Sequence, residues 1–176
     1  FLLISSLPVF CSAKTVPVLA VLSQIKGKVK AGPAKKMTEG VNGKMLLHRH
    51  RVRTEKKGRA TIFFYDGSEV RLFGATELII GAKKSRDSRW MRYRLVLISG
   101  SLWGYFVRGN NPVEIGGGGT RLQFSNTFLR FSKKKTGIDI SVSSGMALVF
   151  NKVSSIKLLA GQRLYQIQQN EFLPEK

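Results

Sequence analysis

Residues 60–73 read ATIFFYDGSEVRLF, which is two runs of β-branched and aromatic residues joined by Asp66-Gly67. Runs of this composition are typical of β-strands. The Asp-Gly dipeptide favours the positive backbone angles that a tight hairpin turn requires. The stretch therefore predicts an antiparallel hairpin, and it is the strongest local structural signal in the chain.

Similar short runs recur along the rest of the chain, separated by glycines and polar residues, while a helical pattern is almost absent. Nine further candidate strands have this composition: 77–80, 93–98, 101–107, 121–124, 127–131, 138–142, 146–150, 156–159 and 163–167. The predicted fold is an all-β domain of short strands with little or no helix. Such strands fit either a twisted, β-solenoid-like stack or a β-sandwich-like domain.

A glycine interrupts the apolar sequence in a similar way at three places, which are Ile98-Ser-Gly-Ser-Leu102, Val142-Ser-Ser-Gly-Met146 and Leu159-Ala-Gly-Gln-Arg-Leu164. The shared pattern predicts repeated corners between strands. The run 146–150 is apolar on both alternating faces. It therefore predicts a strand that lies between two layers.

Two internal segments break the strand pattern, the basic stretch 81–92 and the glycine-rich tract 109–120. Both are predicted to be surface loops. The last residues, 168–176, lose the apolar periodicity, and we expect a C-terminal tail that frays.

The first residues, 1–13, are uncharged, apolar or small, and they end in Cys11-Ser-Ala13. This pattern predicts the remnant of a signal peptide, followed by a domain over residues 14–167. The end of a transmembrane anchor is the alternative, since a complete span needs about 20 apolar residues. If cleavage follows Ala13, the only cysteine is removed, and the mature domain can form no internal disulfide. We expect no membrane span in that mature chain, because no other apolar stretch approaches the required length.

An ordered set of short motifs runs through the hairpin region. Arg53-Thr54 is followed by a Gly-Arg-Ala step, an apolar run, an Asp-Gly-Ser turn and a second strand. This order resembles the signature of the FecR domain family. The residues that carry the resemblance are Arg53, Thr54, Arg59, Ala60, Asp66, Gly67 and Ser68.

The resemblance implies a twisted, solenoid-like fold and no catalytic residues. Members of the family include membrane sensors that pass an envelope signal to a sigma factor, and stand-alone exported proteins built on the same domain. Because no cytoplasmic segment precedes Phe1 in the printed sequence, we expect the second kind, an exported, non-catalytic binding or scaffold module. The alternative is the periplasmic sensor part of a sigma-factor regulator. Asn126 stands where the family often has glycine, and asparagine tolerates the left-handed backbone that such a turn needs.

Enzymatic chemistry finds little support in the residues. His48 and His50 alternate with arginines, which repel a metal cation, although the spacing would place both rings on one side of a strand. The tract 116–119 is followed by neither a helix nor the Lys-Ser/Thr pair of a phosphate loop. The acidic residues are scattered singly, so no pair for acid-base catalysis is visible. We expect no enzyme, no cofactor and no metal site.

Charge is the remaining functional signal. Lys and Arg total 30 against 10 acidic residues, which gives a formal net charge of +20 and favours polyanionic partners. The predicted binding residues lie in basic loops: Lys56, Lys57, Lys83, Lys84, Arg86 and Arg89. Trp90, Tyr93, Trp103 and Tyr105 are candidate stacking partners, and for Trp103 the strand pattern around it favours the core instead. For an exported protein of the periplasm or cell surface, we expect an anionic envelope polymer or a protein partner rather than nucleic acid.

Overall fold

The computed structural model describes residues 17–84, 91–107, 113–117, 119–167 and 173–174. Every regular element in these ranges is a β-strand, which confirms the all-β prediction. The fifteen strands are β1 (Val18–Lys26), β2 (Val29–Pro33), β3 (Thr38–Glu39), β4 (Met45–Leu47), β5 (His50–Thr54), β6 (Arg59–Phe64), β7 (Glu69–Leu72), β8 (Glu77–Lys84), β9 (Met91–Phe106), β10 (Val113–Gly117), β11 (Thr120–Lys133), β12 (Gly137–Phe150), β13 (Ser155–Leu159), β14 (Arg163–Ile167) and β15 (Leu173–Pro174).

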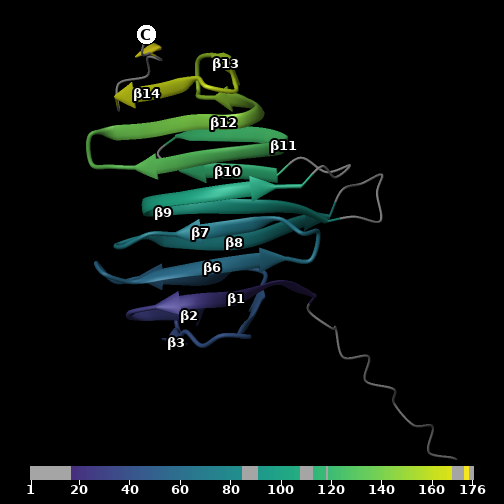
Figure 1. The fold of residues 1–176 in the computed structure, drawn as a ribbon, viewed down its shortest axis with the longest axis vertical. Coiled ribbons are helices and arrows are strands. Elements are labelled where there is room, and N and C mark those ends of the chain that lie inside the picture. The colour runs from purple at the N-terminus through teal and green to yellow at the C-terminus, as the bar shows by residue number, and fades with distance from the viewer. Residues whose placement is uncertain (1–16, 85–90, 108–112, 118, 168–172, 175–176) are drawn as a thin grey trace, which may run out of the picture.

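The strands are stacked along the long axis of the molecule, with the N-terminal strands at one end and the C-terminal strands at the other (Figure 1). Hydrogen bonds connect them into one continuous sheet that folds into two layers. The first layer follows the order β4, β1, β6, β7, β9, β11, β12, β14, and the second layer contains β2, β5, β8, β10 and β13. One cluster of buried apolar side chains fills the space between the layers, with Leu22, Ile62, Leu78 and Leu97 fully buried.

Three long strands belong to both layers. The first half of β9 pairs with β8, and its second half pairs with β7 and β11. The strands β11 and β12 divide in the same way, as their register shifts show. The predicted strands were therefore correctly placed, but six of the short runs join in pairs into strands of 14 to 16 residues. A glycine or asparagine lets the chain bend without ending the strand.

The predicted glycine corners are confirmed, because Gly100, Gly145 and Gly161 all have positive φ angles at the points where the chain changes layer. Asn126, with φ of 50°, takes the left-handed conformation expected of it.

The corners between the two layers lie in two columns. One column holds the corners that follow β1, β5, β7 and the first half of β9, and the other holds those in β11, in β12 and between β13 and β14.

Successive corners of the first column are hydrogen-bonded to one another. The N–H of Glu55 donates to the carbonyl of Lys28 at 3.0 Å, and the N–H of Ala75 donates to the carbonyl of Glu55 at 3.1 Å. The hydroxyl of Thr76 then donates to the carbonyl of Ser101 at 3.0 Å and accepts from its N–H at 2.9 Å. Each corner therefore supports the next, and Thr76 lies wholly buried at the centre of the column.

Gly100 is a tightly enclosed corner residue of this column. Its φ is +87°, and a Cβ atom there would lie 2.3 Å from the Thr76 Oγ1 and 2.5 Å from its Cα. In the second column, a Cβ atom at Gly145 would lie 2.3 Å from the carbonyl oxygen of Asn126. The glycines are thus needed for close backbone approach as well as for their backbone angles.

The Asp66-Gly67 hairpin is confirmed. It joins β6 to β7, and Gly67 has a φ of 86°. The Asp66 carboxylate accepts a hydrogen bond from the N–H of Ser68 at 2.9 Å, as is usual for an Asx turn. The buried Ser68 hydroxyl in turn accepts from the N–H of Val107 at 3.2 Å, which ties the hairpin to the end of β9.

Several expectations about loops and layers need correction. Residues 113–117 form strand β10 rather than a loop, since the small Gly117 lets this segment lie close to β9, where a Cβ atom would approach the carbonyl oxygen of Leu97 to 2.7 Å. The strand ends Lys84 and Met91 extend into the predicted loop 81–92. The run 146–150 does not lie between layers, because Met146 and Leu148 are exposed on its outer face.

The predicted N-terminal segment 1–13 lies outside the described residues. Of the predicted tail, 168–176, only residues 173–174 are described, and they pair with β14 as β15. Among the described residues, no helix has the length and apolar character that a membrane crossing requires.

A half-buried ion pair near the C-terminal end predicts an acid-sensitive contribution to stability. The Nε and Nη2 atoms of Arg163 donate to the two carboxylate oxygens of Asp139 at 2.9 and 2.8 Å. This hydrogen bonding, opposed by burial, lowers the pKa of Asp139 below its ordinary value. A lowered folded-state pKa adds stability that is present above the ordinary carboxyl pKa of about 4 and is lost as the pH falls through the folded value.

We therefore expect the stability difference between the wild-type chain and the Asp139→Asn variant to be larger at neutral pH than in acid below about pH 4. Urea unfolding at the two pH values measures it. An equal difference at both would show that the carboxylate charge adds nothing.

Candidate functional site

The six predicted basic binding residues do not come together in one described site. Lys56 and Lys57 lie at the corner between β5 and β6, next to the start of β8. Lys83 and Lys84 lie at the opposite end of β8, about 20 Å away at the usual rise of roughly 3.3 Å per residue. Arg86 and Arg89 lie outside the described residues, so binding by that loop stays a prediction.

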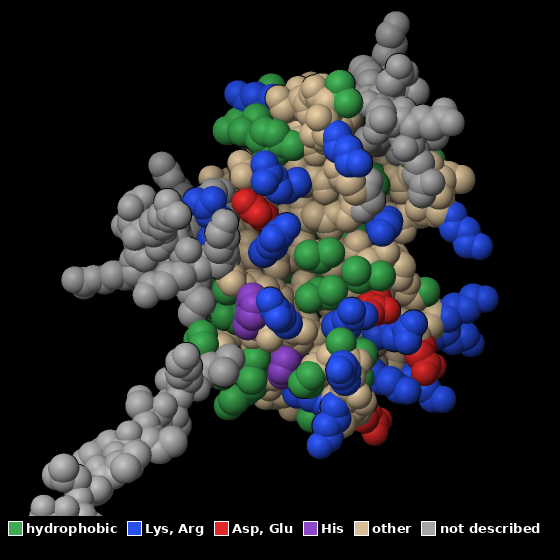
Figure 2. All heavy atoms as spheres, turned by 180° about the vertical axis from the view of Figure 1, so that it is seen from behind, with side chains coloured by type: hydrophobic (Ala, Val, Ile, Leu, Met, Phe, Trp, Pro, Cys, Tyr) green, Lys and Arg blue, Asp and Glu red, His purple; other side chains and the backbone are tan. Residues whose placement is uncertain are grey.

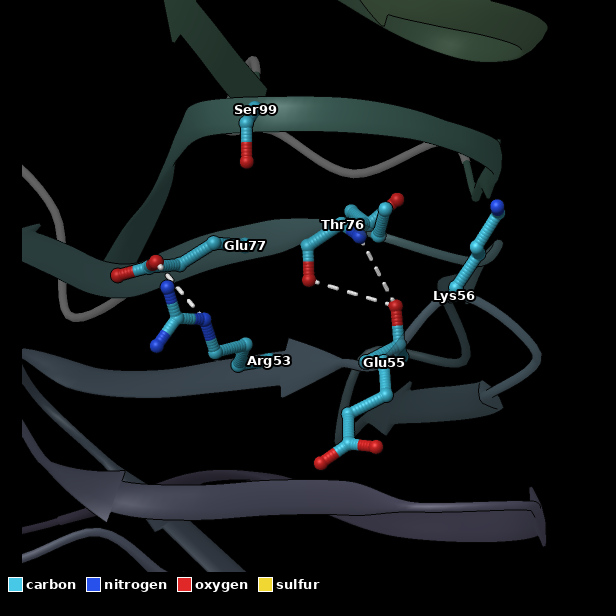
Figure 3. A pocket seen from close by; sticks show the side chains of 8 residues that line it. Arg53, Glu55, Lys56, Thr76, Glu77 and Ser99 are labelled. Carbon is cyan, nitrogen blue, oxygen red and sulfur yellow. Dashed lines mark hydrogen bonds and ion pairs between the residues drawn. The ribbon is translucent and has the colours of Figure 1, made fainter.

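Lys56 belongs to a pocket of about 470 Å³ between consecutive corners (Figure 3). Its wall contains Arg53 and Glu77, whose Nε and carboxylate atoms lie 3.4 Å apart, and Glu77 also accepts from Arg51 at 2.8 Å. Thr54 and Thr76 meet at the back of the pocket, where the N–H of Thr76 donates to the Thr54 Oγ1 at 3.0 Å. These polar groups satisfy one another, so the pocket resembles a structural joint more than a vacant binding site.

The FecR-like residues Thr54, Asp66, Gly67 and Ser68 therefore have structural roles in corners and turns. Ala60 is buried in the core, and Arg53 pairs with Glu77. Arg59 differs from these residues, because it is exposed on the outer face of β6.

Arg59 lines a second depression, of about 310 Å³, on the outer face of the first layer. We call it the basic-aromatic groove, and its defining side chains are Lys26, Arg59, Arg71, Phe73 and Trp103. It crosses the strands β1, β6, β7 and β9, which are consecutive neighbours in the first layer. At a spacing of about 4.8 Å between strands, the four strands span roughly 14 Å.

A bulge in β1 brings two of the cations together. Ser23 pairs with Thr61, but the register then shifts by one residue, so that Lys26 rather than Ile25 lies opposite Arg59. Gln24, at the bulge, has a φ of 47°, and its side-chain carbonyl accepts from the hydroxyl of Thr61 at 2.9 Å. Local backbone geometry thus places two like charges directly across a strand pair.

The groove carries an excess of positive charge. Arg71 forms an ion pair with Glu69 on the same strand, whereas neither Lys26 nor Arg59 has an ion pair within the described parts of the chain. Like charges directly opposite one another on neighbouring strands destabilise a sheet. The pair therefore has an electrostatic cost that no described contact offsets.

Aromatic rings form the other wall of the groove. Trp103 is 38% exposed, so its predicted place in the core is wrong. It contacts Phe73 and Phe128 edge to face, with both pairs of ring centroids 5.7 Å apart. A smaller hollow of about 90 Å³ continues the groove beside Trp103 and Tyr105.

Of the other predicted stacking residues, Tyr93 instead packs inward, with its ring centroid 4.7 Å from that of Phe64, and burial raises the pKa of its phenol to about 12. Trp90 lies outside the described residues.

The histidines do not share one side of a strand as expected. Arg49 between them has a φ of 65° in the turn that separates β4 from β5. The Nδ1 atom of His48 accepts from the N–H of Ala82 at 3.1 Å, and burial lowers the pKa of His50. Within the described ranges, no three His, Cys, Asp or Glu side chains are grouped as metal ligands would be.

Positive charge also extends beyond the groove. Figure 2 shows Lys and Arg side chains spread over the face seen from behind and most frequent near the N-terminal strands, with few Asp and Glu among them. The groove differs from the rest of this basic surface because two cations that lie opposite one another share a hollow with aromatic rings.

The sequence predicts strands β6, β7 and β9 of the groove but not the groove itself. The hairpin turn predicts that Arg71 lies opposite Thr61, two residues from Arg59. Nothing in the sequence predicts the bulge that aligns Lys26, or that β9 follows β7 in the first layer.

The chain matches no model of a known protein family, and it matches no curated protein. Two solved structures share its fold, and both are of a protein from Parabacteroides distasonis ATCC 8503 described as "a putative anti-sigma factor". The first has a TM-score of 0.60 and 14% sequence identity, and the second has a TM-score of 0.59 and 15% identity. Each match covers 71% of this chain and 58% of the solved one, so the shared region is little more than half of that protein. The chain is thus similar in fold to part of a protein described as an anti-sigma factor.

Proposed function

We propose that this chain is the non-catalytic sensor domain of a sigma-factor regulator of the FecR type, exported to face the bacterial envelope. The observation that carries the proposal is the fold shared with the protein described as an anti-sigma factor. The FecR-like motifs support it, since Thr54, Asp66 and Ser68 hold the corner and hairpin of that same fold.

The structure also favours recognition over catalysis as the mode of action. The groove offers cations and rings to a ligand, and the carboxylates of Glu69 and Glu77 are held in ion pairs. A recognition domain needs a stable surface and a partner, and it needs no reacting group.

A transcriptional experiment in the source bacterium tests the proposal. The Gly100→Ala variant should disrupt the domain, whereas Gly161→Ala, with nothing within 4 Å of its added Cβ atom, should spare it. We expect transcripts from promoters of one shared sequence class to change severalfold in the first strain and not in the second. Unchanged transcripts in the Gly100→Ala strain, with loss of the folded protein, would contradict a regulatory role.

A second candidate function is an exported module that binds an anionic envelope polymer without any link to transcription. The formal net charge of +20 favours it, and so do Lys26 and Arg59 of the groove, which form no ion pair with any described residue. In that case, the Gly100→Ala strain would lose polymer binding while its promoter classes stayed unchanged.

A further inference from the structure

We propose that the basic-aromatic groove binds an acidic polysaccharide of the uronic acid type, with one carboxylate on each sugar. The inference rests on the proposed function in one respect, the location outside the cytoplasm. Outside the cytoplasm, the polyanions that a protein commonly meets include extended anionic glycans rather than nucleic acid.

The order of the cations across the sheet matches such a ligand. Lys26 and Arg59 lie directly opposite one another on β1 and β6, and Arg71 lies on the next strand, β7, opposite Thr61 and two residues further along. Neighbouring strands are about 4.8 Å apart, close to the length of one pyranose residue in an extended chain. A glycan that crosses the strands diagonally can therefore place one carboxylate between Lys26 and Arg59 and a later one beside Arg71.

The two kinds of cation have different roles in this arrangement. The guanidinium of Arg59 is exposed and has no acidic partner in the described chain, so it is available for a two-pronged hydrogen bond to a carboxylate. Lys26, directly opposite, supplies a point charge. Binding an anion between them also removes the repulsion that the bulge in β1 creates.

The apolar wall suits sugar rings. Trp103 and Phe73 lie beside the cations in the same hollow, and Trp103 keeps 38% of its surface exposed. The C–H faces of a pyranose are apolar and pack against aromatic side chains, while its carboxylate remains free to meet the cations. Glu69 neutralises Arg71, with which it forms an ion pair, so Lys26 and Arg59 give the groove a net positive charge.

The test is calorimetric titration of the purified chain with oligogalacturonate at physiological salt. We expect the Lys26→Ala/Arg59→Ala variant to bind about tenfold more weakly or worse, because two charged contacts are lost. The matched control is Lys152→Ala/Lys157→Ala, which removes the same charge from an exposed site near β13, and its affinity should change by less than about twofold. Arg59→Lys keeps the charge but not the planar fork, so we expect an intermediate loss.

Four outcomes would overturn the inference: an equal loss in both double variants, no measurable binding of oligogalacturonate, tighter binding of single-stranded DNA, or tighter binding of vesicles with anionic lipids. The four substituted side chains are exposed, so circular dichroism should show unchanged folding. The titration uses no sigma factor and the transcriptional experiment uses no glycan. Failure of one therefore leaves the other standing.

Discussion

The Gly100→Ala variant should lose about 3 kcal/mol of its free energy of unfolding. Alanine at a left-handed backbone position costs about 1 kcal/mol, and overpacking adds roughly 1–3 kcal/mol. Here the added Cβ atom would meet the Thr76 Oγ1 at 2.3 Å and the carbonyl oxygen of Ala75 at 2.6 Å. Both belong to the hydrogen-bonded corner column, so neither can shift without breaking a bond to Ser101 or Glu55.

Urea unfolding monitored by circular dichroism measures this loss, and Gly161→Ala is the matched control. Gly161 has a φ of +83° with nothing within 4 Å of an added Cβ atom, so it reports the backbone cost alone. We expect about 1 kcal/mol for the control. Equal losses in the two variants would mean that close approach at Gly100 contributes nothing.

The Thr54→Val variant should lose about 2 kcal/mol of its free energy of unfolding, because it removes a buried hydroxyl. Valine has nearly the same shape as threonine, so the packing is preserved. Thr54 is 2% exposed, and its Oγ1 donates to the carbonyl of Phe73 while accepting from the N–H of Thr76. Valine leaves these two backbone groups without that partner in a buried corner, and each unsatisfied buried group costs about 1–3 kcal/mol. The variant should unfold at a lower urea concentration with an unchanged slope.

Two comparisons isolate the hydroxyl. Thr54→Ser keeps it and should retain most of the stability that valine loses. Thr38→Val removes an exposed hydroxyl that accepts from the Lys44 ammonium, and its effect should stay within about 0.5 kcal/mol. A free energy of unfolding of Thr54→Val equal to that of the wild-type chain would show that the hydroxyl contributes nothing, because valine keeps the methyl group and replaces only the hydroxyl.

Local sequence predicts the strands and turns from β6 to β14 well, apart from β10, because their signals lie within a few residues. Asp66-Gly67 specifies its hairpin, and the glycines at 100 and 145 mark corners. Whether a strand ends at such a corner or continues through it depends on partners far along the chain. Gly100, for example, lies opposite Lys133 of β11. The three long strands were therefore predicted as six short ones.

The candidate site was harder to predict, for a related reason. In the run 101–107, both alternating faces are apolar, so the period of two cannot show that Leu102 and Phe106 face inward while Trp103 faces solvent. The place of Lys26 depends on a single-residue bulge. Charge counting pointed to the loops instead, since runs of lysine are visible in sequence and cations on separate strands are not.

The two columns of corners have a consequence for how this kind of domain changes over evolution. Each strand, corner and following strand forms a unit that rests on the unit before it, with bonds from corner to corner such as Lys28 to Glu55 and Glu55 to Ala75. Whole units can be gained or lost at either end of the stack, because an end unit has only one neighbour. An insertion of a single residue at a corner would instead misalign the bonds between that corner and its neighbours. Related proteins should therefore differ in length by whole units, with the spacing inside each corner kept.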